Sequence, residues 1–210
     1  MLSTQISTDI WITATWDDYL KAIALFPEQG KSYFYNHQMR LEMPPVGNDH
    51  AGDHSIIIYA VHLFAGINNI DLNGKDNFSY RKVGMQEAQP DASFYIGERA
   101  NIVPWGTGIV DLDRYPPPDL VIEIANTSLA DDMGNKRLLY EDMKVSEYWI
   151  VDVQKVEILA FAIANQGSRR IRQFEVLPSL DIATLETALQ RSRQSNHGKV
   201  SPWLLAQFQE

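Results

Sequence analysis

The sequence predicts an α/β fold in which helices flank a mixed β-sheet. Residues 119–126 and 147–153 are short, strongly apolar runs, and a helical pattern lies between them over 129–143. This order predicts two parallel strands joined by a crossover helix. Apolar residues recur at helical spacing over 50–69. Since further strand-like segments follow residue 153, we expect a sheet with parallel and antiparallel strands and helices on its faces.

The first part of the chain predicts a helix followed by a β-hairpin, as an extension before the main sheet. Residues 15–26 have an amphipathic pattern that Pro27 ends. Residues 32–43 are rich in strand formers, and a tight turn is expected near Asn36 and His37. This segment is therefore an N-terminal helix and hairpin.

The rest of the chain is divided by its turn-forming residues. Pro44 and Pro45 mark a loop before the helix over 50–69. Three consecutive prolines at 116–118 precede the first apolar run of the crossover unit and are expected to end any preceding helix or strand. The other strands and the last helix are expected at 78–86, 89–96, 155–163, 169–177 and 181–193.

Length and composition limit the class of protein. The 210 residues suit a single domain over 1–194 with a tail at 195–210 that packs on the domain or on a partner. The chain has no cysteine, which excludes disulfides, thiolate zinc sites and a cysteine nucleophile. No apolar run approaches 18 residues and no signal peptide is visible, so we expect a cytoplasmic protein without a membrane span. The net charge of -9 argues against a general nucleic-acid coat protein.

Asp91 is the first candidate functional residue. It follows Pro90 at the start of an apolar strand, and Ser93 and Tyr95 share its face. Aspartate is unfavourable in strands, so its presence there favours a functional role. The alternative is an aspartate that only caps a turn.

Glu123 is the second candidate, because it interrupts an apolar strand. A carboxylate buried there must be paired with a cation, protonated or bound to a metal. Asp119 lies four residues earlier and is expected on the same face of the strand. Like charges in one place favour a divalent ion between them, and Mg²⁺ prefers such oxygen ligands. A simple ion pair of Glu123 with arginine or lysine is the alternative.

The helix that follows this strand offers a cation. Asp132, Lys136 and Tyr140 are spaced i, i+4 and i+8, which places them on roughly one face. Lys136 could reach back over Glu123 and orient an attacking water or stabilise a phosphate. An ordinary pair between Asp132 and Lys136 is the alternative.

The early part of the chain adds two accessory candidates. His50 and His54 have the spacing of a helical metal pair, although no zincin motif surrounds them. His50 alone, in contact with a substrate, is the preferred interpretation. Glu42, on the expected hairpin, could also face the site. The chain has no glycine-rich phosphate loop, nucleophile elbow or dinucleotide fingerprint.

Several motifs together resemble the Uma2 family, also called DUF820, which is widespread in cyanobacteria. They are PDASF, PDLVIEIANTS, the spaced D-x₃-K-x₃-Y and VSEYWIVD, and the segment YFYNHQMRLEMPPVGNDH resembles the strand-turn-strand of that family. The resemblance extends over about residues 15–180. It implies the PD-(D/E)xK restriction-endonuclease-like fold.

The resemblance also implies roles for individual residues. Asp91 and Glu123 correspond to metal ligands. The backbone carbonyl of Ile124 would be the third ligand that the protein supplies. The basic motif expects a lysine two residues after the glutamate, where this chain has Ala125. Lys136 on the next helix is the match for that lysine.

The sequence therefore predicts a metal-dependent endonuclease that uses Mg²⁺ or Mn²⁺ to hydrolyse DNA. The alternative is a non-catalytic module that binds nucleic acid or protein on the same fold, which the acidic net charge favours. We also expect a two-fold homodimer, because dimers are the commonest homo-oligomers and the apolar run WLLAQF offers an interface.

Overall fold

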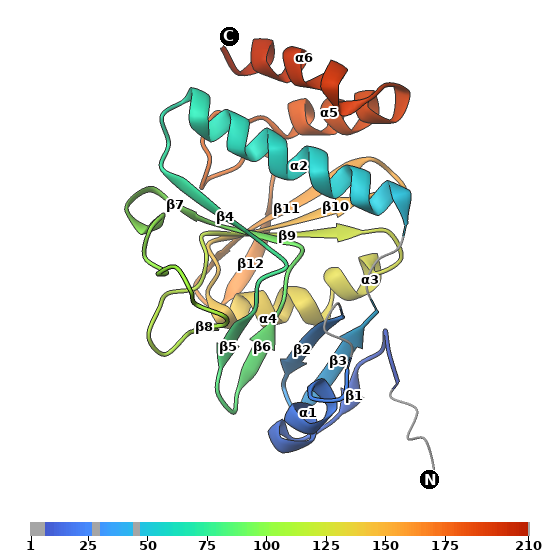
Figure 1. Cartoon of the computed structure of the whole chain (residues 1–210), viewed down its shortest axis with the longest axis vertical. Helices are drawn as coiled ribbons and strands as arrows, with labels where there is room; N and C mark the ends of the chain where they lie inside the picture. Colours follow the sequence, from blue (N-terminus) through green and yellow to red (C-terminus); the bar gives the residue numbers. More distant parts are fainter. Residues whose placement is uncertain (1–6, 27–29, 44–46, 210) are drawn as a thin grey trace.

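The computed structural model describes residues 7–26, 30–43 and 47–209. It has an α/β architecture with two six-stranded sheets, each of which contains both parallel and antiparallel pairs. Figure 1 shows the sheet that contains β9 (Leu120–Ala125) and β10 (Glu147–Asp152) in the middle of the molecule and the N-terminal hairpin below it. The expected fold class is therefore confirmed, with a second sheet in addition to the one that the sequence predicts.

The main sheet has the strand order β12-β11-β10-β9-β7-β4. Its strands are, in chain order, β4 (Leu72–Asp76), β7 (Ala92–Ile96), β9 (Leu120–Ala125), β10 (Glu147–Asp152), β11 (Glu157–Ala164) and β12 (Gly167–Ile171). The second sheet has the order β1-β3-β2-β6-β5-β8. Its strands are β1 (Ile12–Thr13), β2 (Lys31–Tyr35), β3 (Gln38–Glu42), β5 (Tyr80–Lys82), β6 (Gln86–Ala88) and β8 (Val110–Asp111).

The helices lie on both faces of the main sheet (Figure 1). α2 (Asn48–Ile67), α5 (Ile182–Gln194) and α6 (His197–Gln209) cover one face. The shorter α3 (Leu129–Asp132) and α4 (Asn135–Met143) lie on the opposite face, between the main sheet and the second sheet. The remaining helices are α1 (Trp16–Ile23) and the single 3₁₀ turn at Gly97–Arg99.

Strand β9 divides the interior into two cores, because alternate residues of a strand point to opposite faces. Leu120, Ile122 and Ile124 belong to the core under α2, α5 and α6. Val121 and Ala125 belong to the other core, which is rich in tyrosine. Glu123 has the same parity as these two residues, so its carboxylate enters the tyrosine-rich core.

The predicted N-terminal helix and hairpin are confirmed. Thr15 caps α1 through a capping box with Asp18, which satisfies backbone donors at the start of the helix. Asn36 and His37 connect β2 to β3 with φ angles of 47° and 56°. These positive angles at both central residues match the twist of the two-residue turns that connect hairpin strands.

Some predicted boundaries are wrong, and the reasons are local. The single helix expected over 129–143 is broken at Gly134, where a Cβ atom would lie 3.0 Å from the carbonyl oxygen of Ala130. The strand expected over 169–177 ends at Ile171. β4 was not expected, because Gly74 and its polar neighbours lack the pattern of a strand. The expected strand over 78–86 is divided into β5 and β6 around Gly84.

The C-terminal segment forms helix α6, which contacts α2 and α5. Val200 and Leu204 are buried in the core of this chain, and Trp203 and Phe208 pack against that core. The apolar residues that suggested an interface are thus largely used within the chain, and the homodimer stays a prediction. The helix end expected at Pro27 and the loop at Pro44 lie outside the described residues.

Among the residues that the structure describes, none of the helices has both the length and the apolar character needed to cross a bilayer.

Replacing Leu204 by alanine tests whether α6 contributes to the core. Leu204 is 0% exposed, so Leu204→Ala should lower the free energy of unfolding by about 2–5 kcal/mol. The neighbouring Leu205 is 40% exposed, and Leu205→Ala should change stability by less than about 0.5 kcal/mol. Urea denaturation measures both variants. Equal, small effects would show that α6 does not pack as described.

Candidate active site

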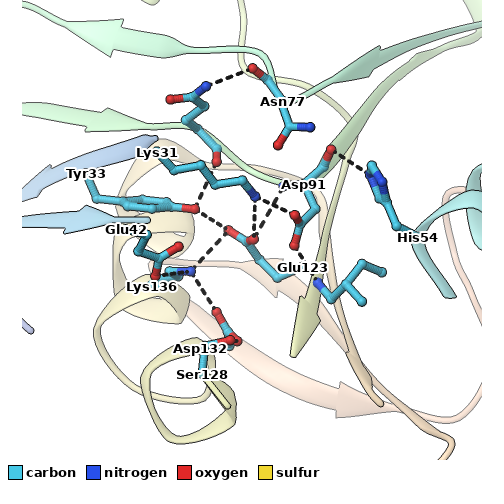
Figure 2. A network of polar contacts seen from close by, with 12 residues as sticks. Lys31, Tyr33, Glu42, His54, Asn77, Asp91, Glu123, Ser128, Asp132 and Lys136 are labelled. Atoms are coloured by element: carbon cyan, nitrogen blue, oxygen red, sulfur yellow. Dashed lines mark hydrogen bonds and ion pairs between the residues drawn. The ribbon is translucent and has the colours of Figure 1, made fainter. Parts of the chain in front are cut away.

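The pairing of β7 with β9 brings the two candidate acids together. The strands are antiparallel, and Ala92 pairs with Ile122. Continuing this register by one residue in each direction places Asp91 opposite Glu123. The backbone N–H of Asp91 lies 3.4 Å from Oε2 of Glu123. Both side chains are buried, and they lie at the point where β7 begins (Figure 2).

Asp91 is held by three different donors. Its Oδ2 accepts a hydrogen bond from the backbone N–H of Ile124 at 2.7 Å, and its Oδ1 accepts one from Nζ of Lys31 at 2.5 Å. Nε2 of His50 lies 3.4 Å from the same Oδ1. Burial alone would raise the pKa of Asp91, but Lys31 and His50 outweigh it and hold this pKa well below its usual range. Asp91 is therefore an ionised carboxylate.

Glu123 lies among tyrosine hydroxyls. Its Oε1 accepts a hydrogen bond from Tyr140 at 2.6 Å, and the hydroxyl of Tyr33 lies 3.3 Å from the same oxygen. Its Oε2 lies 3.9 Å from Nζ of Lys31. Burial raises the pKa of Glu123 to about 8, against the opposing effect of Lys136 and Lys31. Without a further cation, this carboxyl group therefore holds a proton at neutral pH.

Lys136 is enclosed by acidic and aromatic groups. Its Nζ lies 2.9 Å from Glu42, 3.0 Å from Asp132 and 3.9 Å from Oε1 of Glu123. It also lies 4.5 Å from the centre of the Tyr33 ring, close enough for a cation–π interaction. Burial opposes the charge on Lys136, but the surrounding carboxylates hold its pKa well above the usual value. Lys136 is thus a fixed, buried cation.

A cavity of about 670 Å³ opens onto this group of residues. Its polar walls come from the hairpin, the start of α2 and the loop after β9. The lining residues are Asp9, Lys31, Arg40, Glu42, Met43, Gly47, His50, Asp91, Ile124, Asn126, Thr127, Ser128 and Lys136. A substrate in this cavity would reach Asp91, Lys31 and His50 directly.

The structure brings most of the predicted site residues together. Asp91, Glu123 and Lys136 belong to one network with the accessory candidate Glu42 (Figure 2). The accessory candidate Tyr140 joins it through its hydrogen bond to Glu123. The other accessory candidate, His50, lies at the same carboxylate as Lys31.

Asp119 does not share this site, contrary to the expectation. Residues four apart in a strand lie about 13 Å from one another, too far to bind one ion even on the same face. The carboxylate of Asp119 instead accepts a hydrogen bond from the backbone N–H of Ile96 and pairs with Arg99. Its role is to hold the end of β7.

The histidine pair is also not a metal pair. His50 approaches Oδ1 of Asp91, whereas Nε2 of His54 hydrogen-bonds the backbone oxygen of Asp91 at 3.1 Å. The two imidazole rings are therefore directed at different atoms, with ring centres 6.1 Å apart. Asp53, beside them in the sequence, pairs with Arg193.

Sequence reasoning missed Lys31, Tyr33 and Arg40. All three are on the N-terminal hairpin, which packs beside the site although it is far away in the sequence. A signal was present in β2, because Lys31 and Tyr33 share the face of a strand that is otherwise apolar or aromatic. A lysine on such a face needs a buried acidic partner.

The donors present fit a hard divalent cation. In the described ranges, no three histidine or acidic side chains gather at one point to hold an ion. Asp91 and Glu123 nevertheless supply two carboxylates, and the carbonyl of Ile124 points to the same side of β9 as its N–H, toward Asp91. Mg²⁺ commonly uses one or two carboxylates and keeps several waters, so this set is sufficient.

The charge balance favours the same conclusion. Ion pairs connect a buried charge cluster of five acids and three cations: Glu42, Asp91, Glu123, Asp131 and Asp132 with Lys31, Arg40 and Lys136. With every acid ionised, and with lysine and arginine alone counted as cations, the cluster would carry two uncompensated negative charges. A divalent cation would neutralise both negative charges. In its absence, the proton on Glu123 neutralises one of them.

Solved structures with the same fold include a nuclease-like protein. One is from Anabaena variabilis ATCC 29413 and is described as "a putative nuclease belonging to DUF820". It is 18% identical, the alignment covers 83% of this chain and 98% of that one, and the TM-score is 0.59. At this identity the likeness shows a shared α/β fold.

The particular family follows from the sequence. The Uma2 family model, described as "Putative restriction endonuclease", matches residues 16–201. The chain therefore belongs to the Uma2 family, and the resemblance inferred from its motifs is confirmed. No curated protein matches the chain.

The raised pKa of Glu123 predicts how stability depends on pH in the absence of metal. A carboxyl group whose pKa rises from about 4.5 to about 8 on folding binds more protons in the folded state, so its contribution to stability falls as pH rises through that window. Glu123→Gln stays neutral, so it should unfold at a higher urea concentration than the wild type at pH 8.5 and at a similar one at pH 5. Urea denaturation in EDTA measures both. A variant that is equally destabilised at both pH values would contradict this.

Lys136 should be essential for stability. Lys136→Met leaves Glu42 and Asp132 buried without their cation, and removal of one partner from a buried ion pair costs about 3–5 kcal/mol. Lys155, which is exposed on the turn after β10, is the matched control, and Lys155→Met should have little effect. Chemical denaturation of the two variants measures the difference, and similar stabilities would disprove the structural role of Lys136.

Proposed function

We propose that this protein is a metal-dependent nuclease that hydrolyses phosphodiester bonds of DNA at the site formed by Asp91 and Glu123. One observation supports this most strongly. The two buried acids present Oδ1 and Oε2 toward the same cation, Lys31, which lines a polar cavity together with Asp91. The family description and the nuclease-like structural neighbour support the same class of reaction.

Asp91, Glu123 and the carbonyl of Ile124 would hold Mg²⁺ or Mn²⁺. When bound, the ion would polarise the scissile phosphate and lower the pKa of a bound water. The protein keeps the ligands in place: the N–H of Ile124 fixes one oxygen of Asp91, and Tyr140 fixes one oxygen of Glu123. The second oxygen of each acid would then be available to the ion.

The other residues of the cavity would bind and orient the substrate. His50, Arg40 and Thr127 line it, so they could donate hydrogen bonds to phosphate oxygens. Lys136 keeps Glu123 and Glu42 in position. In this proposal it acts mainly through Glu123, because its own donors face Glu42 and Asp132.

The direct test is a cleavage assay on plasmid and on single-stranded DNA with Mg²⁺ and with Mn²⁺. The wild type should cleave at least one substrate, and EDTA should stop the reaction. Asp91→Ala should lower the rate by on the order of 100-fold or more, because it removes a ligand that no other residue can replace. Asp119→Asn is the matched control, since Asp119 is a buried acid on the neighbouring strand outside the site, and it should cleave normally.

Two results would contradict the proposed function. One is the absence of cleavage by the wild-type protein in every combination of metal and substrate, which would favour a binding module on the same fold. The other is an Asp91→Ala variant that cleaves at the wild-type rate.

A further inference from the structure

Lys31 lies where a metal ion would be expected. It is the first residue of β2 and only 5% exposed. Its Nζ lies 2.5 Å from Oδ1 of Asp91 and 3.9 Å from Oε2 of Glu123 (Figure 2). One ammonium group thus contacts the first acid and faces the second.

The remaining oxygens of these two acids already have other partners. Oδ2 of Asp91 accepts from the backbone of Ile124, and Oε1 of Glu123 accepts from Tyr140. Oδ1 and Oε2 both face Nζ of Lys31, at 2.5 Å and 3.9 Å, and each has one longer contact of 3.4 Å, with His50 and with the N–H of Asp91 respectively. An ion that bridges the two acids through these oxygens would therefore take the position of the Lys31 ammonium group.

We propose that Lys31 is a built-in cation that occupies the metal position in the metal-free protein and is displaced into the cavity when a divalent ion binds. The inference rests on the proposed function only in requiring a divalent ion at this site. It assigns Lys31 a role distinct from that of Lys136, which stays in place.

Electrostatics requires the displacement. An ammonium group and a divalent ion cannot contact the same two oxygens, because like charges at about 4 Å repel strongly in a buried site. Lysine has a flexible stem of four carbons, and Lys31 lines the cavity of about 670 Å³, so its side chain has space to move. Lys136 has no such freedom, since Glu42 and Asp132 hold it.

The displaced ammonium group would need a new counter-charge. A charged group this close to a protein interior is unfavourable unless it is paired. A phosphate group of a substrate in the cavity supplies that charge. Metal binding and phosphate binding are then coupled, because each favours the displaced position of Lys31, and this coupling is reciprocal.

Lysine labelling of the wild-type protein tests the displacement directly. The protein is treated briefly with an amine-acetylating reagent in EDTA or in saturating Mn²⁺, and labelling of each lysine is measured by mass spectrometry. Labelling of Lys31 should rise several-fold with Mn²⁺, while buried Lys136 stays unlabelled and exposed Lys155 stays labelled in both conditions. Unchanged or reduced labelling of Lys31 in saturating Mn²⁺ would overturn the proposal.

Calorimetry of Mn²⁺ binding gives an independent test. Lys31→Met removes the competing cation and should bind Mn²⁺ about tenfold or more tightly than the wild type. Lys31→Arg keeps the charge and should bind no more tightly than the wild type. Lys155→Met, which loses the same charge at an exposed residue outside the cavity lining, should match the wild type. If Lys31→Met bound Mn²⁺ with unchanged or lower affinity, Lys31 would not compete with the ion.

Folding of the variant is part of the same test. Without Lys31 the metal-free acids lose their cation, so Mn²⁺ should raise the melting temperature of Lys31→Met more than that of the wild type. An equal or smaller rise would contradict the proposal. Failure of the proposed function is a separate result: a wild type that binds Mn²⁺ and exposes Lys31 but cleaves no DNA would disprove the nuclease and leave this inference intact.

Discussion

The site depends on two carboxylates that the pairing of β7 with β9 buries side by side. The register places Asp91 opposite Glu123 at the start of β7, and both side chains are buried. Buried negative charge must be compensated by cations, protons or hydrogen-bond donors. The surrounding structure supplies all three: Lys31 and Lys136, the proton on Glu123, and the hydroxyl of Tyr140.

The N-terminal hairpin supplies much of this compensation. Lys31 and Tyr33 on β2 and Arg40 and Glu42 on β3 enter a site whose acids are on the main sheet. The hairpin and the main sheet are thus held together by charge as well as by the tyrosine-rich core. Because this attachment relies on buried ion pairs, a change in the charge of the site will also affect how the hairpin packs. The charge of the site and the stability of the hairpin are therefore linked in this protein.

The sequence predicted the fold class, both central acids and the lysine of α4, because each produces a local signal. Glu123 interrupts an apolar strand, and Lys136 lies at helical spacing from Asp132 and Tyr140. The sequence could not predict Lys31, since its partner Asp91 is 60 residues away and only the packing of the hairpin joins them. The expectation for Asp119 failed for a related reason. Alternation along a strand predicts which face a side chain is on, but it does not place Asp119 close to Glu123, which is four positions further along the chain. The break between α3 and α4 depends on the backbone conformation at Gly134. The spacing of apolar residues carries no information about that conformation.

The most direct test of this account is the crystal structure of the protein with Mn²⁺, with the ion located by its anomalous scattering. The account predicts one strong peak at ligand distance from Oδ1 of Asp91 and Oε2 of Glu123, with the Nζ of Lys31 moved into the cavity. At saturating Mn²⁺, a structure without a peak at this position, in which Lys31 still joins the two acids, would contradict it.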